Sequence, residues 1–205
     1  MSTIGLDKLY FAKITEASET GYETYGSPVA APGVQSADFS LNIATVKNYA
    51  DDGTWEEVRE FIDGTMTIGA AGLTPAMIAD LTGATVDGKG ILVAADEDSP
   101  NLFAVGFRSL RANHTYEYVW LYRVKFTVPD KNYATKGENV SFSNLSIVGT
   151  INRRKKPDYN SRHPWRAFGD PDTADATTIS GWFSAVYEPT APSTQNSGGS
   201  GGGGG

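Results

Sequence analysis

The sequence contains no cysteine, which excludes disulfide bridges, thiolate metal ligands and cysteine nucleophiles together. It has only two histidines, His114 and His163, and each stands in a polar, turn-like context, so we expect neither a general base nor a histidine metal site. No apolar run is long enough to cross a bilayer, and the first residues lack the basic and apolar regions of a secretory signal. These absences predict a soluble, unsecreted chain and are compatible with a reducing cytoplasm.

The motifs of common enzymes are also missing. No G-x-S-x-G elbow, Walker loop, G-x-G-x-x-G fingerprint or H-E-x-x-H pair occurs. The acidic groups at 51–52 and 96–98 precede turn residues and do not match the spacing of a calcium loop, so we interpret them as acidic turns. Nothing selects a pair of carboxylates for glycosidase chemistry. We therefore expect no enzymatic activity, no cofactor and no metal.

Negative charge is in excess, and positive charge is concentrated late in the chain. The net charge of -7 at pH 7 disfavours nonspecific binding to nucleic acid or to an anionic membrane. The run RRKK at 153–156, followed by Arg162 and Arg166, gathers much of the positive charge. Short charge runs usually form solvated loops, and the alternative here is a contact with an acidic neighbouring subunit.

Apolar residues make up 40% of the chain, and in several windows they alternate with polar residues. A period of two predicts half-buried β-strands, because successive side chains point to opposite faces of a sheet. The windows are 38–43, 65–68, 103–107 and 178–187. In the third, the small Ala104 and Gly106 would let another group approach closely. The fourth would be a final strand with Trp182 exposed, and exposed tryptophan is typical of interfaces.

The segment YVWLYRVKF at 118–126 is a further strand candidate, and it needs cover on both faces. Its alternation places one set of residues on a core face: Tyr118, Trp120, Tyr122, Val124 and Phe126. The opposite face begins with Val119 and Leu121 and turns to charged residues only afterwards. One end of this strand must therefore pack against something on each side.

Residues 73–83, LTPAMIADLTG, carry the one good helix signal. Thr74 can cap the helix, Pro75 fits its first position, and Gly83 fits the left-handed residue just past its end. An apolar stripe on this helix could supply part of the second layer over a strand such as 118–126.

Three segments are irregular. In 138–151 the apolar phase shifts, which predicts a bulge near Ser143 and Asn144. Residues 16–33 and 153–175 are too long for ordinary hairpin loops, and long ordered loops usually bind something.

These patterns predict a mainly β fold: a two-sheet β-sandwich or partly closed barrel, with one short flanking α-helix and long loops. We expect one domain over residues 1–189. Residues 190–205 have the composition of a flexible Ser/Gly-rich tail or an added linker.

Four segments occur here in an order that resembles the major tail proteins, or tail tube proteins, of long-tailed bacteriophages. They are KNYADDGTWEE, TIGAAGLTPAMIADLTGA, YVWLYRVKFTVP and TKGENVSFSNLSIVGTI, within a likeness that spans roughly Leu6 to Tyr187. The resemblance implies a structural virion protein that closes into hexameric rings, which stack into the tail tube and guide the genome into the host. It implies synthesis in the bacterial cytoplasm and a final location in the phage tail.

The implied partners are further copies of the chain, a tape measure protein, and tail terminator and tip proteins. Double-stranded DNA would pass through the tube without specific binding, and no membrane contact is implied. The loop from Tyr49 to Glu57 falls where tube proteins carry an extended loop that contacts adjacent subunits or rings. Trp55 is then either an interface anchor or buried within its own subunit. The candidate subunit-interface residues are Tyr49, Asp51, Asp52, Trp55, Arg153, Arg154, Trp165 and Trp182.

Two functions of other classes stay open. A monomeric β-sandwich could bind carbohydrate through Trp55, Trp165 or Trp182. A hydrolase that uses a dispersed acidic pair has the least support. Self-assembly separates the tail tube from both.

Overall fold

The computed structural model describes residues 3–16, 18–50, 53–128 and 145–192. The strands are β1 (Thr3–Glu16), β2 (Glu23–Tyr25), β3 (Val29–Ala31), β4 (Val34–Ala50), β5 (Gly53–Ala70), β6 (Thr85–Val86), β7 (Leu92–Val93), β8 (Leu102–Arg111), β9 (Tyr116–Phe126), β10 (Leu145–Asn152) and β11 (Arg166–Gly169). Two short helices, α1 (Pro75–Thr82) and α2 (Ala176–Ser180), complete the described elements. The predicted mainly β class is confirmed.

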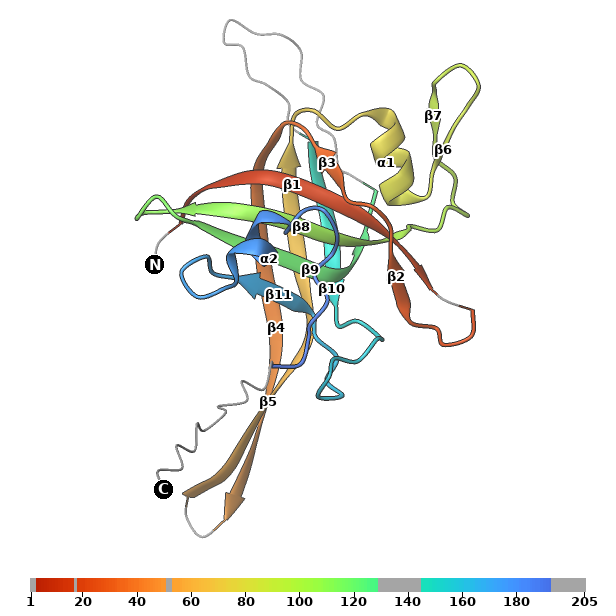
Figure 1. The fold of residues 1–205 in the computed structure, drawn as a ribbon. Coiled ribbons are helices and arrows are strands. Elements are labelled where there is room, and N and C mark those ends of the chain that lie inside the picture. Colours follow the sequence, from red (N-terminus) through yellow and green to blue (C-terminus); the bar gives the residue numbers. More distant parts are fainter. Residues whose placement is uncertain (1–2, 17, 51–52, 129–144, 193–205) are drawn as a thin grey trace, which may run out of the picture.

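One large antiparallel sheet forms the body of the molecule. Its strand order is β2-β1-β8-β9-β10-β5-β4, with β3 added to β1 and β11 added to β9, while β6 and β7 form a separate hairpin. The sheet bends so that β4 lies near β1, but these two strands form no ladder, and the sheet stays open. The result is the expected sandwich-like arrangement, with α1 against the sheet (Figure 1).

An inner cluster of buried apolar side chains fills the concave side of the bent sheet. It joins residues of β1, β5, β8, β9 and β10 to Leu81 of α1. Met66 and Ile68 are fully buried here while Thr65 of the same strand is exposed, as the alternation at 65–68 predicts. Phe103, Val105 and Phe107 also belong to this cluster, which confirms the face assigned to 103–107.

An outer cluster covers the other face of β8 and β9. Its buried members are Ala12, Ala104, Trp120, Tyr122, Trp182 and Val186. Trp120 lies against Gly106, where an added Cβ atom would stand 2.6 Å from the indole ring. The predicted close approach at Gly106 is therefore made by the neighbouring strand of the same chain.

The predicted face of 118–126 is wrong in its second half. Phe103 pairs with Val124 but Val105 pairs with Leu121, so β9 uses one more residue than β8 between these pairs. This bulge moves Val124 and Phe126 to the inner cluster, on the side of Val119 and Leu121. Of the residues predicted to share a face with Tyr118, only Trp120 and Tyr122 belong to the outer cluster. From Val119 to Tyr122 both faces of β9 are buried, so this part of the strand has the cover on each side that the sequence predicts.

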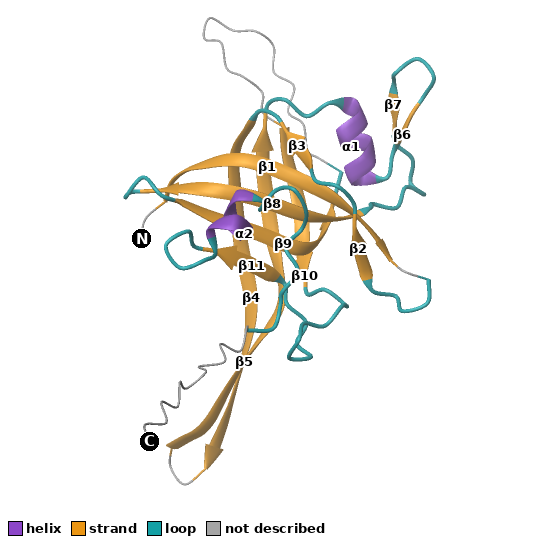
Figure 2. Cartoon of the chain, in the orientation of Figure 1, coloured by secondary structure: helices purple, strands orange, loops and turns teal. Residues whose placement is uncertain are grey.

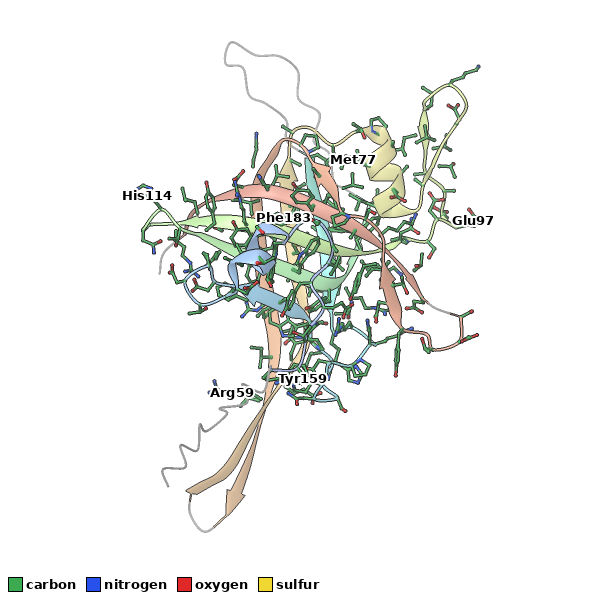
Figure 3. All side chains as sticks on the ribbon, in the orientation of Figure 1. Arg59, Met77, Glu97, His114, Tyr159 and Phe183 are labelled. Atoms are coloured by element: carbon green, nitrogen blue, oxygen red, sulfur yellow. The ribbon has the colours of Figure 1, made fainter. Side chains whose placement is uncertain are left out.

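The predicted final strand at 178–187 is also wrong. Residues 176–180 form α2, capped by Asp175, and the chain continues in turns rather than in a ladder. Trp182 is 4% exposed, and its backbone oxygen accepts a hydrogen bond of 3.0 Å from Nε1 of Trp120. Phe183, labelled in Figure 3, lies over the body of the sheet, and its ring stacks on Tyr10 with centroids 4.5 Å apart. This C-terminal segment, not a neighbouring molecule, covers the second face of β9.

The helix at 75–82 forms as predicted. The Thr74 side chain accepts a hydrogen bond from the backbone N–H of Met77, Pro75 begins the helix, and Gly83 ends it in the left-handed region at φ 79°. Leu81 packs into the inner cluster, so α1 covers the concave side rather than the outer face of β9.

The other irregular segments are partly ordered into strands. Residues 16–33 contain β2 and β3, and residues 153–175 contain β11. The bulge expected near Ser143 and Asn144 lies outside the described residues. The boundary expected near residue 189 stays a prediction.

Candidate interaction surface

A long hairpin formed by β4 and β5 projects from the body (Figures 1 and 2). The two strands pair up to the tip, where Tyr49 faces Thr54 and Ala50 faces Gly53, with a register shift between Asn48 and Tyr49 that leaves Trp55 as an extra residue on β5. We call residues 43–50 and 53–61 the arm. The end of the molecule that carries α1 and the β6–β7 hairpin lies opposite the arm (Figure 1).

The arm leaves the body at a bulge. Asn42 pairs with Asp63 and Ile43 pairs with Phe61, so Ile62 is an extra residue on β5. A bulge bends its strand and increases the local twist. Ile43 is 51% exposed and Ile62 is 49% exposed, which leaves apolar surface at this junction. Among the described residues, β4 pairs in a ladder with β5 only, so its outer edge is open.

The segment from Tyr49 to Glu57, expected as an extended loop, consists largely of strand residues. Tyr49 and Trp55 lie near the tip of the arm, and their side chains are outside the part that the structure describes, as are Asp51 and Asp52 entirely. The sequence has a hairpin signal near this point, Asp-Gly at 52–53 between two apolar alternations, although Gly53 itself pairs with Ala50 in the ladder. The interface role of these residues stays a prediction.

Trp165 and Arg153 meet the base of the arm. The Trp165 ring stacks on Phe61 of β5, with centroids 4.8 Å apart and planes 8° apart. Arg153 donates from Nη2 to Oε1 of Glu60 at 2.7 Å and to the backbone oxygen of Phe61 at 3.2 Å. Sequence reasoning identified Trp165 and Arg153 but not their partners Glu60 and Phe61.

The basic run at 153–156 lies in a loop that is exposed at Arg153 and Lys155, half-buried at Lys156 and buried at Arg154, and its cations are paired within the chain. Arg154 is 1% exposed, and its Nη1 lies 2.8 Å from Oε2 of Glu188. Lys156 contacts the other oxygen of Glu188 at 3.2 Å, and Lys155 contacts Glu16 at 2.8 Å. With Arg153 on Glu60, every cation of the run has a carboxylate partner in its own chain. The predicted contact with an acidic neighbour stays untested, but it would have to compete with these pairs.

Glu23 ties this run to β2. Its side chain is fully buried, and its carboxylate accepts hydrogen bonds from the backbone N–H of Lys155 and of Lys156 at 2.8 and 2.9 Å. Arg123 pairs with the same carboxylate. Burial acts to raise the pKa of Glu23, but these hydrogen bonds outweigh it and hold the pKa below its ordinary value of 4.5.

Trp182 is the clearest correction among the candidate interface residues. It was expected to be exposed, but it is buried in the outer cluster against Tyr118 and Tyr187 of its own chain. The structure thus brings Arg153 and Trp165 together at the base of the arm, and it places Arg154 and Trp182 in the interior of the body.

The described residues contain no group of three or more His, Asp or Glu side chains arranged to hold a metal ion. Within the same residues, no helix has the length and apolar character needed to span a membrane.

No protein-family model matches the chain, and no curated protein matches it. The solved structures that are similar to it include two at low identity. The first is described as the anti-feeding prophage cap (AFP tube terminating cap), with a TM-score of 0.44, 9% identity, and coverage of 78% of this chain and 87% of the other. The second is described as the anti-feeding prophage (AFP) baseplate, with a TM-score of 0.39, 8% identity, and coverage of 82% and 97%. Similarity this low does not support an inference about function. The proposed function therefore rests on features of this chain.

Proposed function

We propose that the chain is a structural virion protein whose copies assemble through the arm and the open sheet edge. The observation that carries this proposal is the arm, a two-stranded ribbon that projects from the body with an open β4 edge. An isolated two-stranded ribbon is only marginally stable in water, and an open edge invites pairing with another chain. A neighbouring copy that pairs with β4 would stabilise the ribbon and cover its open edge.

The assembly we propose is a hexameric ring, with rings stacked head to tail as the tail tube of a long-tailed phage. Head-to-tail contacts are heterologous, and heterologous contacts permit an open-ended tube. The function needs no bond-making step. The net charge of -7 favours a conduit in which DNA moves without being held, since tight phosphate contacts require lysine and arginine. Four cations at 153–156 are already paired with carboxylates of the same chain, which reduces their availability to phosphate.

In this proposal the chain binds further copies of itself, and the ends of the tube meet the tape measure protein and the terminator and tip proteins. The particle, not the cell membrane, is its final location.

Carbohydrate binding is disfavoured by the positions of two tryptophans. Trp182 is buried, and Trp165 is stacked on Phe61 with the Arg166 guanidinium 4.7 Å from its ring centroid. A sugar platform needs an accessible aromatic face, and neither ring supplies one freely.

The test compares the full chain with a short-arm variant that lacks residues 47–57, the outer arm. Val46 and Val58 face each other in the ladder, so Asn-Gly in place of residues 47–57 would close a two-residue hairpin between them. We expect hollow tubes or rings of the full chain by negative-stain electron microscopy, and a folded monomer of the short-arm variant by light scattering and circular dichroism.

Tubes formed equally well by the short-arm variant would contradict assembly through the arm. A full chain that stays monomeric at every concentration and binds glycans in a screen would contradict the tail-tube proposal itself.

A further inference from the structure

The direction of the arm depends on the angle at its base, where β4 and β5 leave the body. From Ile43 to Ala50 the arm spans seven residue steps, or about 23 Å at about 3.3 Å per residue, so a rotation of about 10° at the bulge moves the tip by about 4 Å. That displacement approaches the roughly 4.8 Å spacing of neighbouring strands. A freely pivoting arm would therefore miss the pairing register of a neighbour.

The bulge at Ile62 is the natural pivot, and the contacts beside it resist rotation. Phe61, the residue on the arm side of the bulge, stacks on Trp165 with nearly parallel planes. Its backbone oxygen and the Glu60 carboxylate both accept hydrogen bonds from Arg153. Two residues of β5 are thus held by two side chains of one loop, through a stacked ring, an ion pair and a backbone contact.

The loop that supplies these side chains is itself fixed to the body. Its two ends are joined by a 3.1 Å hydrogen bond from the backbone N–H of Arg154 to the oxygen of Pro164. The Trp165 oxygen accepts a 3.0 Å hydrogen bond from the backbone N–H of Tyr122 in β9, where the core is fully buried. Arg154 and Glu188 add a second attachment. The arm is therefore held by a loop attached to the rigid centre of the sheet.

We infer that Trp165 and Arg153 form a clamp that sets the direction of the arm, and that they are positioning residues for assembly. The assembly part rests on the proposed function, whereas the clamp itself is a property of the single subunit. Arg153 and Glu60 are 49% and 63% exposed, whereas Trp165 and Phe61 are partly buried and pack against the inner cluster. The clamp therefore joins a surface ion pair to the edge of the core. The aromatic stack supplies the geometric restraint, because tilting Phe61 away from Trp165 would separate two rings whose planes are 8° apart and would lose their contact.

The absence of cysteine makes a direct distance measurement possible in the full chain. Lys47→Cys places one spin label on the arm, and Ala112→Cys places another on the exposed turn between β8 and β9. Pulsed dipolar spectroscopy then reports the distribution of distances between arm and body. A second pair, Ala112→Cys with Lys125→Cys, lies wholly in the body and serves as the control.

We expect a single narrow distribution for the arm pair in the otherwise unchanged chain. The double variant Trp165→Ala with Arg153→Ala should at least double its width, while the distance distribution of the body pair stays close to that of the parent. Because the Trp165 ring packs against the inner cluster, the thermal unfolding transition should fall, and the unchanged body pair shows that the fold is kept. The conservative variant Trp165→Phe with Arg153→Lys keeps a ring and a charge, and it should restore the narrow distribution. An arm distribution unchanged in the alanine variant would overturn the clamp.

The same variants, without labels, test the consequence for assembly. We expect the alanine variant to need about a tenfold higher concentration to form tubes, the effect of losing about 1.4 kcal/mol of favourable assembly free energy, and the conservative variant to assemble normally. A widened distribution with normal assembly would overturn the positioning role. A parent chain that forms no tubes would count against the proposed function, and the distance measurement would still decide the clamp.

Discussion

At the scale of single residues, the outer cluster depends on the smallest side chain available. Gly106 lies beneath Trp120, and the indole atoms occupy the space that any β-carbon would need. Trp120 cannot withdraw easily, because its Nε1 donates to the Trp182 oxygen and its side chain is fully buried.

Gly106→Ala should destabilise the chain by roughly 1–3 kcal/mol, the usual cost of overpacking a dense core. Gly5→Ala is the matched control, since Gly5 also lies in a strand but has nothing within 4 Å of an added Cβ atom. Chemical denaturation of both variants measures the effect. Equal unfolding free energies for the two variants would show that the Trp120 side chain moves to make room for the added methyl group.

The charge of Glu23 stabilises the loop at the base of the arm. Glu23→Gln removes the negative charge that Arg123 and two backbone N–H groups share, and we expect a loss of roughly 3 kcal/mol near neutral pH, typical of a broken buried pair. The exposed Glu19 supplies the control, Glu19→Gln.

The loss should depend on pH with a defined sign. The pKa of Glu23 is lowered in the folded state, so its contribution is complete above the ordinary value of 4.5 and disappears as the pH falls through the lower folded value. Unfolding free energies of the parent and of Glu23→Gln should therefore converge in acid. A gap that stays constant down to the acid transition would show that the carboxylate charge is not the cause.

At the scale of elements, local signals were predictable and tertiary ones were not. The boundaries of α1 follow from Thr74, Pro75 and Gly83, whose effects act within one turn. The bulge that reverses Val124 follows from its pairing with Phe103, which no local pattern of β9 contains. Likewise, the clamp residues Trp165 and Arg153 stand out in the sequence, but their partners lie far away along the chain, with Arg153 and Glu60 separated by 93 positions.

In the C-terminal segment two periodicities overlap, one of two residues and one of a helix. Ile179, Trp182, Phe183 and Val186 follow the helical spacing i, i+3, i+4 and i+7, and all four contribute to the outer cluster. The alternation of every second residue predicts a strand with Trp182 on its exposed side. The helical count was the signal that could have placed Trp182 inside.

Trp182→Ala should therefore lower the stability of the isolated subunit, by about 3–5 kcal/mol if the cavity stays open. Tyr159→Ala, at a ring that is 47% exposed, should change the unfolding free energy little. Guanidinium titrations of the two variants measure the difference. An unaltered stability in Trp182→Ala would instead return Trp182 to the list of surface anchors.

At the scale of the whole molecule, the fold is built from contacts between distant parts of the chain. β1 pairs along its length with β8, and Asp7 forms an ion pair with Arg108 at the centre of this ladder. Antiparallel pairing over such separations raises the entropy lost before native contacts can form.

We expect refolding from denaturant to take milliseconds to seconds, the range of β-rich domains with mostly non-local contacts. Stopped-flow fluorescence measures it, and interrupted unfolding separates the slow phases that come from the 10 prolines. Complete refolding within microseconds would contradict this dependence on non-local pairing.

β9 has a consequence for how such a chain can evolve. It pairs with β8, β10 and β11, and each of its faces contributes to a buried cluster. Substitutions there are constrained by three neighbouring strands and two buried clusters at once, whereas in the proposed assembly the outer part of the arm would be constrained mainly by its contacts with another copy. Two lineages of this protein could therefore diverge in the arm, and so become unable to form mixed particles, while their β9 strands remained interchangeable.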